Sequence, residues 1–115
     1  MITRKMERVQ RELQRRIASL VLSELKDPRL TCPYAITDAQ ISADLRVLKV
    51  FVSIDAPPPE QDVVLGVLKA ASGRLRHLMG EGLELLVLPE VRFLLDDTPE
   101  KAERIDRILD GLHEG

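Results

Sequence analysis

Residues 68–79 read LKAASGRLRHLM, and a glycine stands in this stretch among four basic residues. Apolar residues three or four positions apart form one helical stripe here: Val64, Leu68, Ala71, Leu75 and Leu78. Gly73 lies off that stripe, in a helix interior where glycine costs about 1 kcal/mol relative to alanine. Two roles follow for it. It permits a kink between two shorter helices, or it lets another backbone approach the helix closely.

A first candidate binding site surrounds this glycine. In a straight helix over 60–79, Lys69, Gly73 and His77 share the polar face. A phosphate chain is one backbone that could approach there, and a helix starting near Gly73 would offer it free N–H groups. The alternative is a helix break with solvated charges around it. The candidate contacts are Lys69, Ser72, Gly73, Arg74, Arg76 and His77, and the kink is expected at Ala71, Ser72 and Gly73.

A second candidate site lies on the first segment, residues 3–26. Apolar residues at helical spacing predict an amphipathic helix there: Met6, Val9, Leu13, Ile17, Leu20 and Val21. Residues 1–16 hold six basic side chains against two acidic ones. The basic face consists of Arg4, Arg8, Arg11 and Arg15, almost opposite the apolar stripe, with Lys5 and Arg16 on its flank. Such a face favours nucleic acid, and an anionic membrane surface is the alternative.

Strand patterns follow the first helix. Residues 34–42 and 46–54 are strand-like, with a hairpin turn at Asp44-Leu45. Three prolines at 57–59 lead into the helix over 60–79, residues 83–95 read as a strand interrupted at Pro89, and 99–111 read as a short acidic helix. The order α-β-β-α(kink)α-β-α predicts one α+β domain over residues 1–115, with helices packed on a three-stranded sheet.

Composition narrows the classes of protein to which this chain can belong. The chain has 115 residues, 31% of them charged, and no apolar run long enough to cross a membrane. No secretory signal pattern is present, and one cysteine excludes an internal disulfide, so we expect a cytoplasmic protein. The net charge of −2 hides an uneven distribution of charge along the chain. Residues 1–16 are mainly basic, whereas residues 96–115 hold seven acidic side chains against three basic ones.

The sequence holds no recognisable catalytic set. Neither a nucleophile–base motif nor a phosphate-binding glycine loop is present. Asp96 and Asp97, with Asp44 or Asp55, could bind a divalent ion, but turn and cap roles are the better reading. Phe51 and Phe93 are expected in the core rather than on a base-stacking platform. We therefore expect no catalytic residue, no metal and no cofactor.

A series of short motifs, in order and at matching spacing, resembles the bacterial ribosome-binding factor A family. The motifs are Arg8-Val9, Asp27-Pro28-Arg29-Leu30, Ile41-Ser42 with Asp44-Leu45, Lys49-Val50-Phe51-Val52-Ser53, Ala71-Ser72-Gly73 with Leu75-Arg76, Pro89-Glu90-Val91-Arg92-Phe93 with Asp96, and Arg104-Ile105. The resemblance covers almost the whole chain, and Ala71-Ser72-Gly73 matches the Ala-x-Gly kink of that family.

This resemblance implies a KH-like fold of type II and a non-enzymatic role in ribosome biogenesis. The implied partners are the small (30S) ribosomal subunit and its 16S rRNA with its precursor. Late maturation, processing of the precursor's 5′ end and growth in the cold are the implied functions. We expect a free monomer with no membrane and no small-molecule substrate.

Two other interpretations remain open at the level of sequence. A protein-interaction module would use the basic first helix to bind an acidic partner, and its binding would survive ribonuclease. A nuclease acting on rRNA would use Asp96 and Asp97 as metal ligands, and a chelator would abolish its activity.

Overall fold

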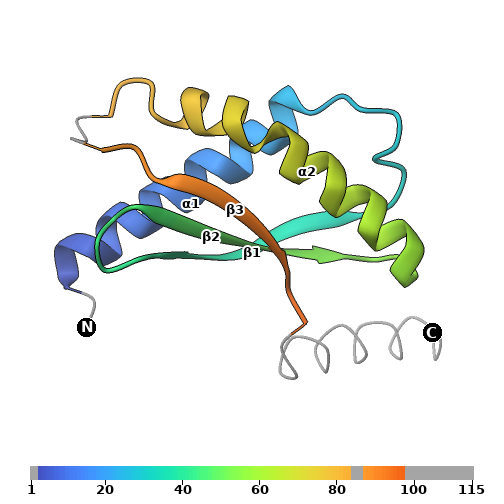
Figure 1. Ribbon diagram of the computed structural model, residues 1–115, viewed down its shortest axis with the longest axis horizontal. Helices are drawn as coiled ribbons and strands as arrows, with labels where there is room; N and C mark the ends of the chain where they lie inside the picture. The colour runs from blue at the N-terminus through green and yellow to red at the C-terminus, as the bar shows by residue number, and fades with distance from the viewer. Residues whose placement is uncertain (1–2, 84–86, 98–115) are drawn as a thin grey trace, which may run out of the picture.

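The computed structural model describes residues 3–83 and 87–97, which form two layers (Figure 1). The elements are α1 (Arg4–Glu24), β1 (Tyr34–Ile41), β2 (Val47–Ile54), α2 (Pro58–Met79) and β3 (Glu90–Leu95). The sheet has the order β1-β2-β3, with β1 antiparallel and β3 parallel to β2. Both helices cover one face of this sheet, which confirms the predicted α+β, KH-like architecture.

Alternation in the strands produces the core. Leu48, Val50, Val52 and Ile54 of β2 are buried under the helices, while the residues between them face the other side of the sheet. From α1, Leu13, Ile17 and Val21 complete the same core, as their spacing predicted. From α2 the core residues are Val64, Leu68, Leu75 and Met79.

The alternative interpretation of Gly73 as a helix break is wrong, whereas the kink expected at Ala71, Ser72 and Gly73 stays a prediction. α2 is helical without interruption from Pro58 to Met79. Buried apolar residues lie on both sides of the glycine, and their burial outweighs a cost of about 1 kcal/mol for one glycine in a helix. Within the continuous helix, the Ser72 hydroxyl donates to the Lys69 carbonyl at 2.8 Å, a contact of the kind that often bends helices. The helical N–H groups near Gly73 are therefore used within α2.

Two further expectations need adjustment. The third strand begins only at Glu90, after the buried Pro89, which lacks the N–H that a ladder needs. Phe93 is in the core as predicted, but Phe51 is only partly buried and lies on the face of the sheet away from the helices. The helix predicted at 99–111 lies outside the described residues. Within the described part of the chain, neither helix is long and apolar enough to cross a membrane.

Candidate nucleic-acid interface

The exposed face of α1 carries the basic row that the sequence predicted. Arg4, Lys5, Arg8, Arg11 and Arg15 are all exposed, on the side of the helix opposite Leu13, Ile17 and Val21. The N-terminal end of this helix is fixed by Thr3, whose hydroxyl accepts a hydrogen bond from the Met6 amide at 3.2 Å. The row is therefore held on a rigid, capped helix.

One acidic residue divides this row into neutralised and free cations. Glu12 accepts from Arg15 at 2.5 Å and from Arg16 at 3.1 Å. Both hydrogen bonds lower the pKa of Glu12, and the one from Arg16 has the larger effect. Among the described residues, the cations of the row without an ion pair are those of the first half of α1: Arg4, Lys5, Arg8 and Arg11.

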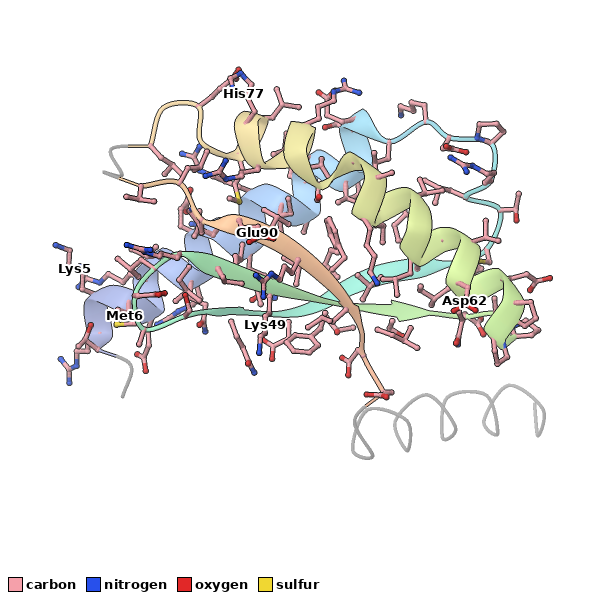
Figure 2. All side chains as sticks on the ribbon, in the orientation of Figure 1. Lys5, Met6, Lys49, Asp62, His77 and Glu90 are labelled. Carbon is pink, nitrogen blue, oxygen red and sulfur yellow. The ribbon has the colours of Figure 1, made fainter. Side chains whose placement is uncertain are left out.

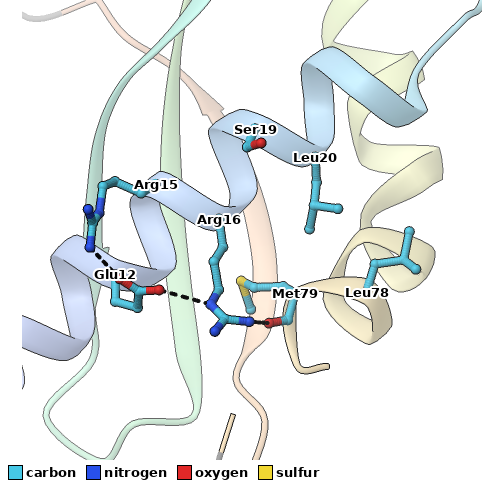
Figure 3. Close-up of a pocket in the computed structure, with 7 residues that line it drawn as sticks. All are labelled: Glu12, Arg15, Arg16, Ser19, Leu20, Leu78 and Met79. Atoms are coloured by element: carbon cyan, nitrogen blue, oxygen red, sulfur yellow. Dashed lines mark hydrogen bonds and ion pairs between the residues drawn. The ribbon is translucent and has the colours of Figure 1, made fainter. Parts of the chain in front are cut away.

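Arg16 has a role inside the molecule. Its guanidinium donates to the Glu81 carbonyl at 2.7 Å. It also donates to the Met79 carbonyl at 3.4 Å, as Figure 3 shows. A positive charge suits the carbonyl end of a helix, so this contact stabilises the last turn of α2 against α1. Of the six basic residues proposed on the first helix, Arg16 is the one that binds another element within residues 3–83 and 87–97.

The exposed face of α2 holds Lys69, Gly73 and His77. Figure 2 shows His77 projecting from the last turn of α2 and Lys5 from the first turn of α1. Apart from the neighbouring residues and backbone of the helix itself, no atom of the described residues lies within 4 Å of the position that a side-chain Cβ would occupy on Gly73. Packing within the described residues therefore does not require a glycine at this position, and the helix backbone there is open to solvent.

The other two arginines of this region have partners in the fold. Arg74 forms an ion pair with Glu24 at 2.7 Å, and its side chain remains 64% exposed. Arg76 donates to the Leu88 carbonyl at 2.6 Å and to the Pro89 carbonyl at 3.1 Å. Arg76 thus holds the segment that leads into β3, whereas Arg74 joins the two helices near the C-terminal end of α1.

The two basic regions share one side of the molecule. Leu13 and Ile17 of α1, like Leu68 and Leu75 of α2, face the same sheet and the same core. The opposite faces of both helices consequently look away from the sheet in the same direction (Figure 1). One extended partner could contact both regions at once.

Arg92 is a basic residue near this site that sequence reasoning did not assign. It lines a groove between α2 and β3 together with Lys69 and Ser72. Its guanidinium pairs with Glu90 at 3.2 Å. The alternation of exposed Glu90, Arg92 and Leu94 with buried neighbours was the signal that places these side chains outside the core.

Two of the aspartates considered as metal ligands, Asp96 and Asp44, accept hydrogen bonds from hydroxyl groups. Asp96 is 8% exposed, and its carboxylate accepts a hydrogen bond from the Thr37 hydroxyl. Asp44 accepts from the Ser42 hydroxyl at 2.6 Å in the hairpin turn. Within residues 3–83 and 87–97, no group of three or more candidate ligand side chains could hold a metal ion.

Comparison with known proteins identifies the family. The family model of ribosome-binding factor A matches residues 5–109. Ribosome-binding factor A of Caldanaerobacter subterraneus subsp. tengcongensis is 37% identical over 106 residues, which are 92% of this chain and 87% of that protein.

Solved structures agree with this match. The crystal structure of ribosome-binding factor A from Thermus thermophilus matches with a TM-score of 0.69 at 26% identity, over 81% of this chain and 98% of that one. A homology model of the Thermus thermophilus factor, fitted into the cryo-EM map of its complex with the 30S subunit, matches with a TM-score of 0.62 at 26% identity, over 76% of this chain and 90% of that one. With its basic helical layer and its two-layer fold, the chain belongs to the ribosome-binding factor A family.

Proposed function

We propose that this chain is a cytoplasmic, non-catalytic assembly factor that binds the small ribosomal subunit and its 16S rRNA. In this role it assists late maturation of the subunit, including processing of the 5′ end of the precursor rRNA. Support comes from family membership and from the Thermus thermophilus relative fitted into a 30S complex.

The observation that carries the proposal is the row of unpaired cations on α1. Arg4, Arg8 and Arg11 span about 10 Å along the helix axis at 1.5 Å per residue. Within the part of the chain that the structure describes, none of them forms an ion pair that would have to be broken before a phosphate could bind. Arginine offers a planar, permanently charged donor set that matches phosphate oxygens.

The exposed face of α2 is the second part of the proposed surface. Lys69 and His77 supply charge or hydrogen-bond donors, and Gly73 leaves room for a phosphate backbone near the helix. Free N–H groups play no part, because α2 is continuous. Arg74 reaches RNA only by leaving Glu24, while Arg16 and Arg76 act by holding the segment after α2 in place.

These contacts position the protein on RNA and do not select bases. Charged side chains that meet phosphates carry little sequence information. We therefore propose that recognition of the subunit depends on the shape of the folded rRNA, which brings phosphates to both helices at once.

The test is co-sedimentation of the full chain with purified 30S subunits. Arg8→Glu with Arg11→Glu is expected to move the protein from the 30S fraction to the top of the gradient. Arg46→Glu with Lys49→Glu is the matched control, since both side chains are exposed on the hairpin and neither belongs to α1 or α2. This control variant is expected to sediment with the subunit as the wild type does.

The other outcomes assign the function differently. If both variants sediment like the wild type, the basic row is not the binding surface. Equal loss in both variants would mean that net charge alone governs binding. Binding by the wild type that survives digestion of the rRNA would favour an acidic protein partner instead.

A further inference from the structure

A groove lies between α1 and the last turn of α2. It has a volume of about 390 Å³, and Figure 3 shows the side chains of both helices that line it. Its apolar part consists of Leu20 from α1 and of Leu78 and Met79 from α2. Leu20 and Leu78 are only partly buried, so the groove presents apolar surface to solvent beside Arg15 of the basic row. A phosphate gains nothing from apolar surface, so this groove suits a different part of an RNA chain.

Two contacts between the helices fix the width of this groove. Arg16 donates to the Glu81 carbonyl at 2.7 Å. About two turns further along α1, Glu24 forms an ion pair with Arg74 at 2.7 Å. Leu20 lies midway between Arg16 and Glu24 on the same side of α1, because residues four positions apart are neighbours on a helix surface. The groove is therefore already formed, and a ligand does not have to separate the helices to enter it.

The polar side chains of the groove suit a nucleotide. The Arg16 guanidinium is held on a second side by its Nε, which donates to Glu12 at 3.1 Å. Unstacked RNA bases stack on guanidinium planes as they do on aromatic rings. Arg15 is 80% exposed, and exchanging its ion pair with Glu12 for a phosphate costs little at such exposure. The exposed Ser19 hydroxyl has no hydrogen-bond partner within residues 3–83 and 87–97 and is free to bind a ligand.

The groove also continues into the basic row. A wider hollow on α1 shares Arg15 and Glu12 with the groove and contains Arg8 and Arg11. Arg11 and Arg15 are about 6 Å apart along the helix axis. An RNA strand with phosphates on Arg8 and Arg11 therefore brings its next nucleotide to the groove. An apolar side chain of a protein would use the leucines there but not these cations.

We propose that this groove takes the base of an unpaired rRNA nucleotide, stacked on the Arg16 guanidinium and packed against Leu20 and Leu78. The inference rests on the proposed function and deepens it, because it assigns part of the contact to a single-stranded element of the rRNA. Every base has a flat face, so the groove accepts a base without selecting a sequence. Phosphate contacts alone let a protein slide along nucleic acid, whereas an inserted base fixes its position.

The test is base-specific chemical probing of 30S subunits saturated with the full chain, with dimethyl sulfate and a carbodiimide as reagents. The wild type is expected to protect an unpaired rRNA base that reacts in the free subunit. Ser19→Leu places an apolar side chain in the groove without changing a core residue. We expect this variant to bind 30S subunits roughly tenfold more weakly and, at saturation, to leave that base reactive.

Ser23→Leu is the matched control for this substitution. Ser23 is exposed on α1, one turn after Ser19, and it does not line the groove. Its change adds the same apolar side chain to the same helix. The control variant is expected to bind 30S subunits with wild-type affinity and to protect the same base.

The outcomes separate this inference from the proposed function. A wild-type chain that does not bind 30S subunits would overturn the proposed function and this inference with it. Wild-type binding with equal affinity and equal protection in Ser19→Leu would overturn the inference alone, since the groove would then be outside the interface. Weaker binding by Ser19→Leu without any protected base in the wild type would assign the groove to a side chain of a ribosomal protein. Equal losses in both variants would show a general effect of apolar substitution on α1 and would also overturn the inference.

Discussion

Gly73 combines an energetic cost with an open position. A glycine inside a helix is less stable than alanine by about 1 kcal/mol, and nothing within 4 Å would obstruct a methyl group at this position. Gly66 has the same two properties two turns earlier on α2, nearer to the acidic Glu60 and Asp62. Alanine substitutions at Gly66 and at Gly73 can therefore be compared to separate the effect of helix propensity from a role in binding.

Gly73→Ala is expected to raise the free energy of unfolding by about 0.5 to 1 kcal/mol, because the unfolded chain loses freedom and the helix gains propensity. Gly66→Ala should raise it equally. If phosphates approach the helix at Gly73, only Gly73→Ala weakens binding to 30S subunits, by roughly fivefold for about 1 kcal/mol. Chemical denaturation and a 30S binding titration measure the two quantities. Unchanged affinity in Gly73→Ala would remove this residue from the interface.

At the scale of elements, two arginines connect parts of the chain that are distant in sequence. Arg16 binds the Glu81 carbonyl 65 residues away, and Arg76 binds the carbonyls of Leu88 and Pro89. Together they hold Glu81, just after α2, and Leu88 and Pro89, just before β3. Hydrogen bonds of this kind from charged groups contribute more than exposed ion pairs do.

Arg16→Gln is expected to lower the free energy of unfolding by about 1 kcal/mol and to speed hydrogen exchange at residues 80–83. Arg15→Gln is the matched control, because Arg15 is 80% exposed and binds only Glu12 among the described residues. Its effect on stability should be below about 0.5 kcal/mol. Urea denaturation and native-state hydrogen exchange give the comparison. Equal effects in the two variants would mean that the contact of Arg16 with α2 adds nothing to stability.

The elements themselves were largely predictable. Both strands of the hairpin and α1 follow patterns of period 2 and 3.6 that depend only on near neighbours. The helix break that stood as an alternative at Gly73 has the same origin. A glycine among basic residues indicates a break locally, whereas the core contacts of Leu68 and Leu75 that keep the helix continuous involve other elements.

For the whole molecule, the proposed surface implies strong dependence on salt. Each phosphate contact releases counterions, and the logarithm of the binding constant falls by roughly 0.7 to 0.9 per contact with the logarithm of salt concentration. Arg8→Gln with Arg11→Gln is expected to reduce this slope by roughly 1.5. Arg46→Gln with Lys49→Gln should leave it unchanged. Titration of 30S subunits at several salt concentrations measures the slopes, and a wild-type slope near zero would contradict the electrostatic proposal.

The sequence by itself determined the order of the described elements, the core face of α1, the basic row opposite that face and the likeness to the family. Each of these depends on spacing within a segment or on motifs in order. The tertiary structure alone decided which cations are free. Arg16, Arg74 and Arg76 find their partners on other elements, while Arg4, Arg8 and Arg11 form no ion pair within the described residues. It also decided that the basic regions share one side, because packing both helices on one sheet sets the direction in which their outer faces point.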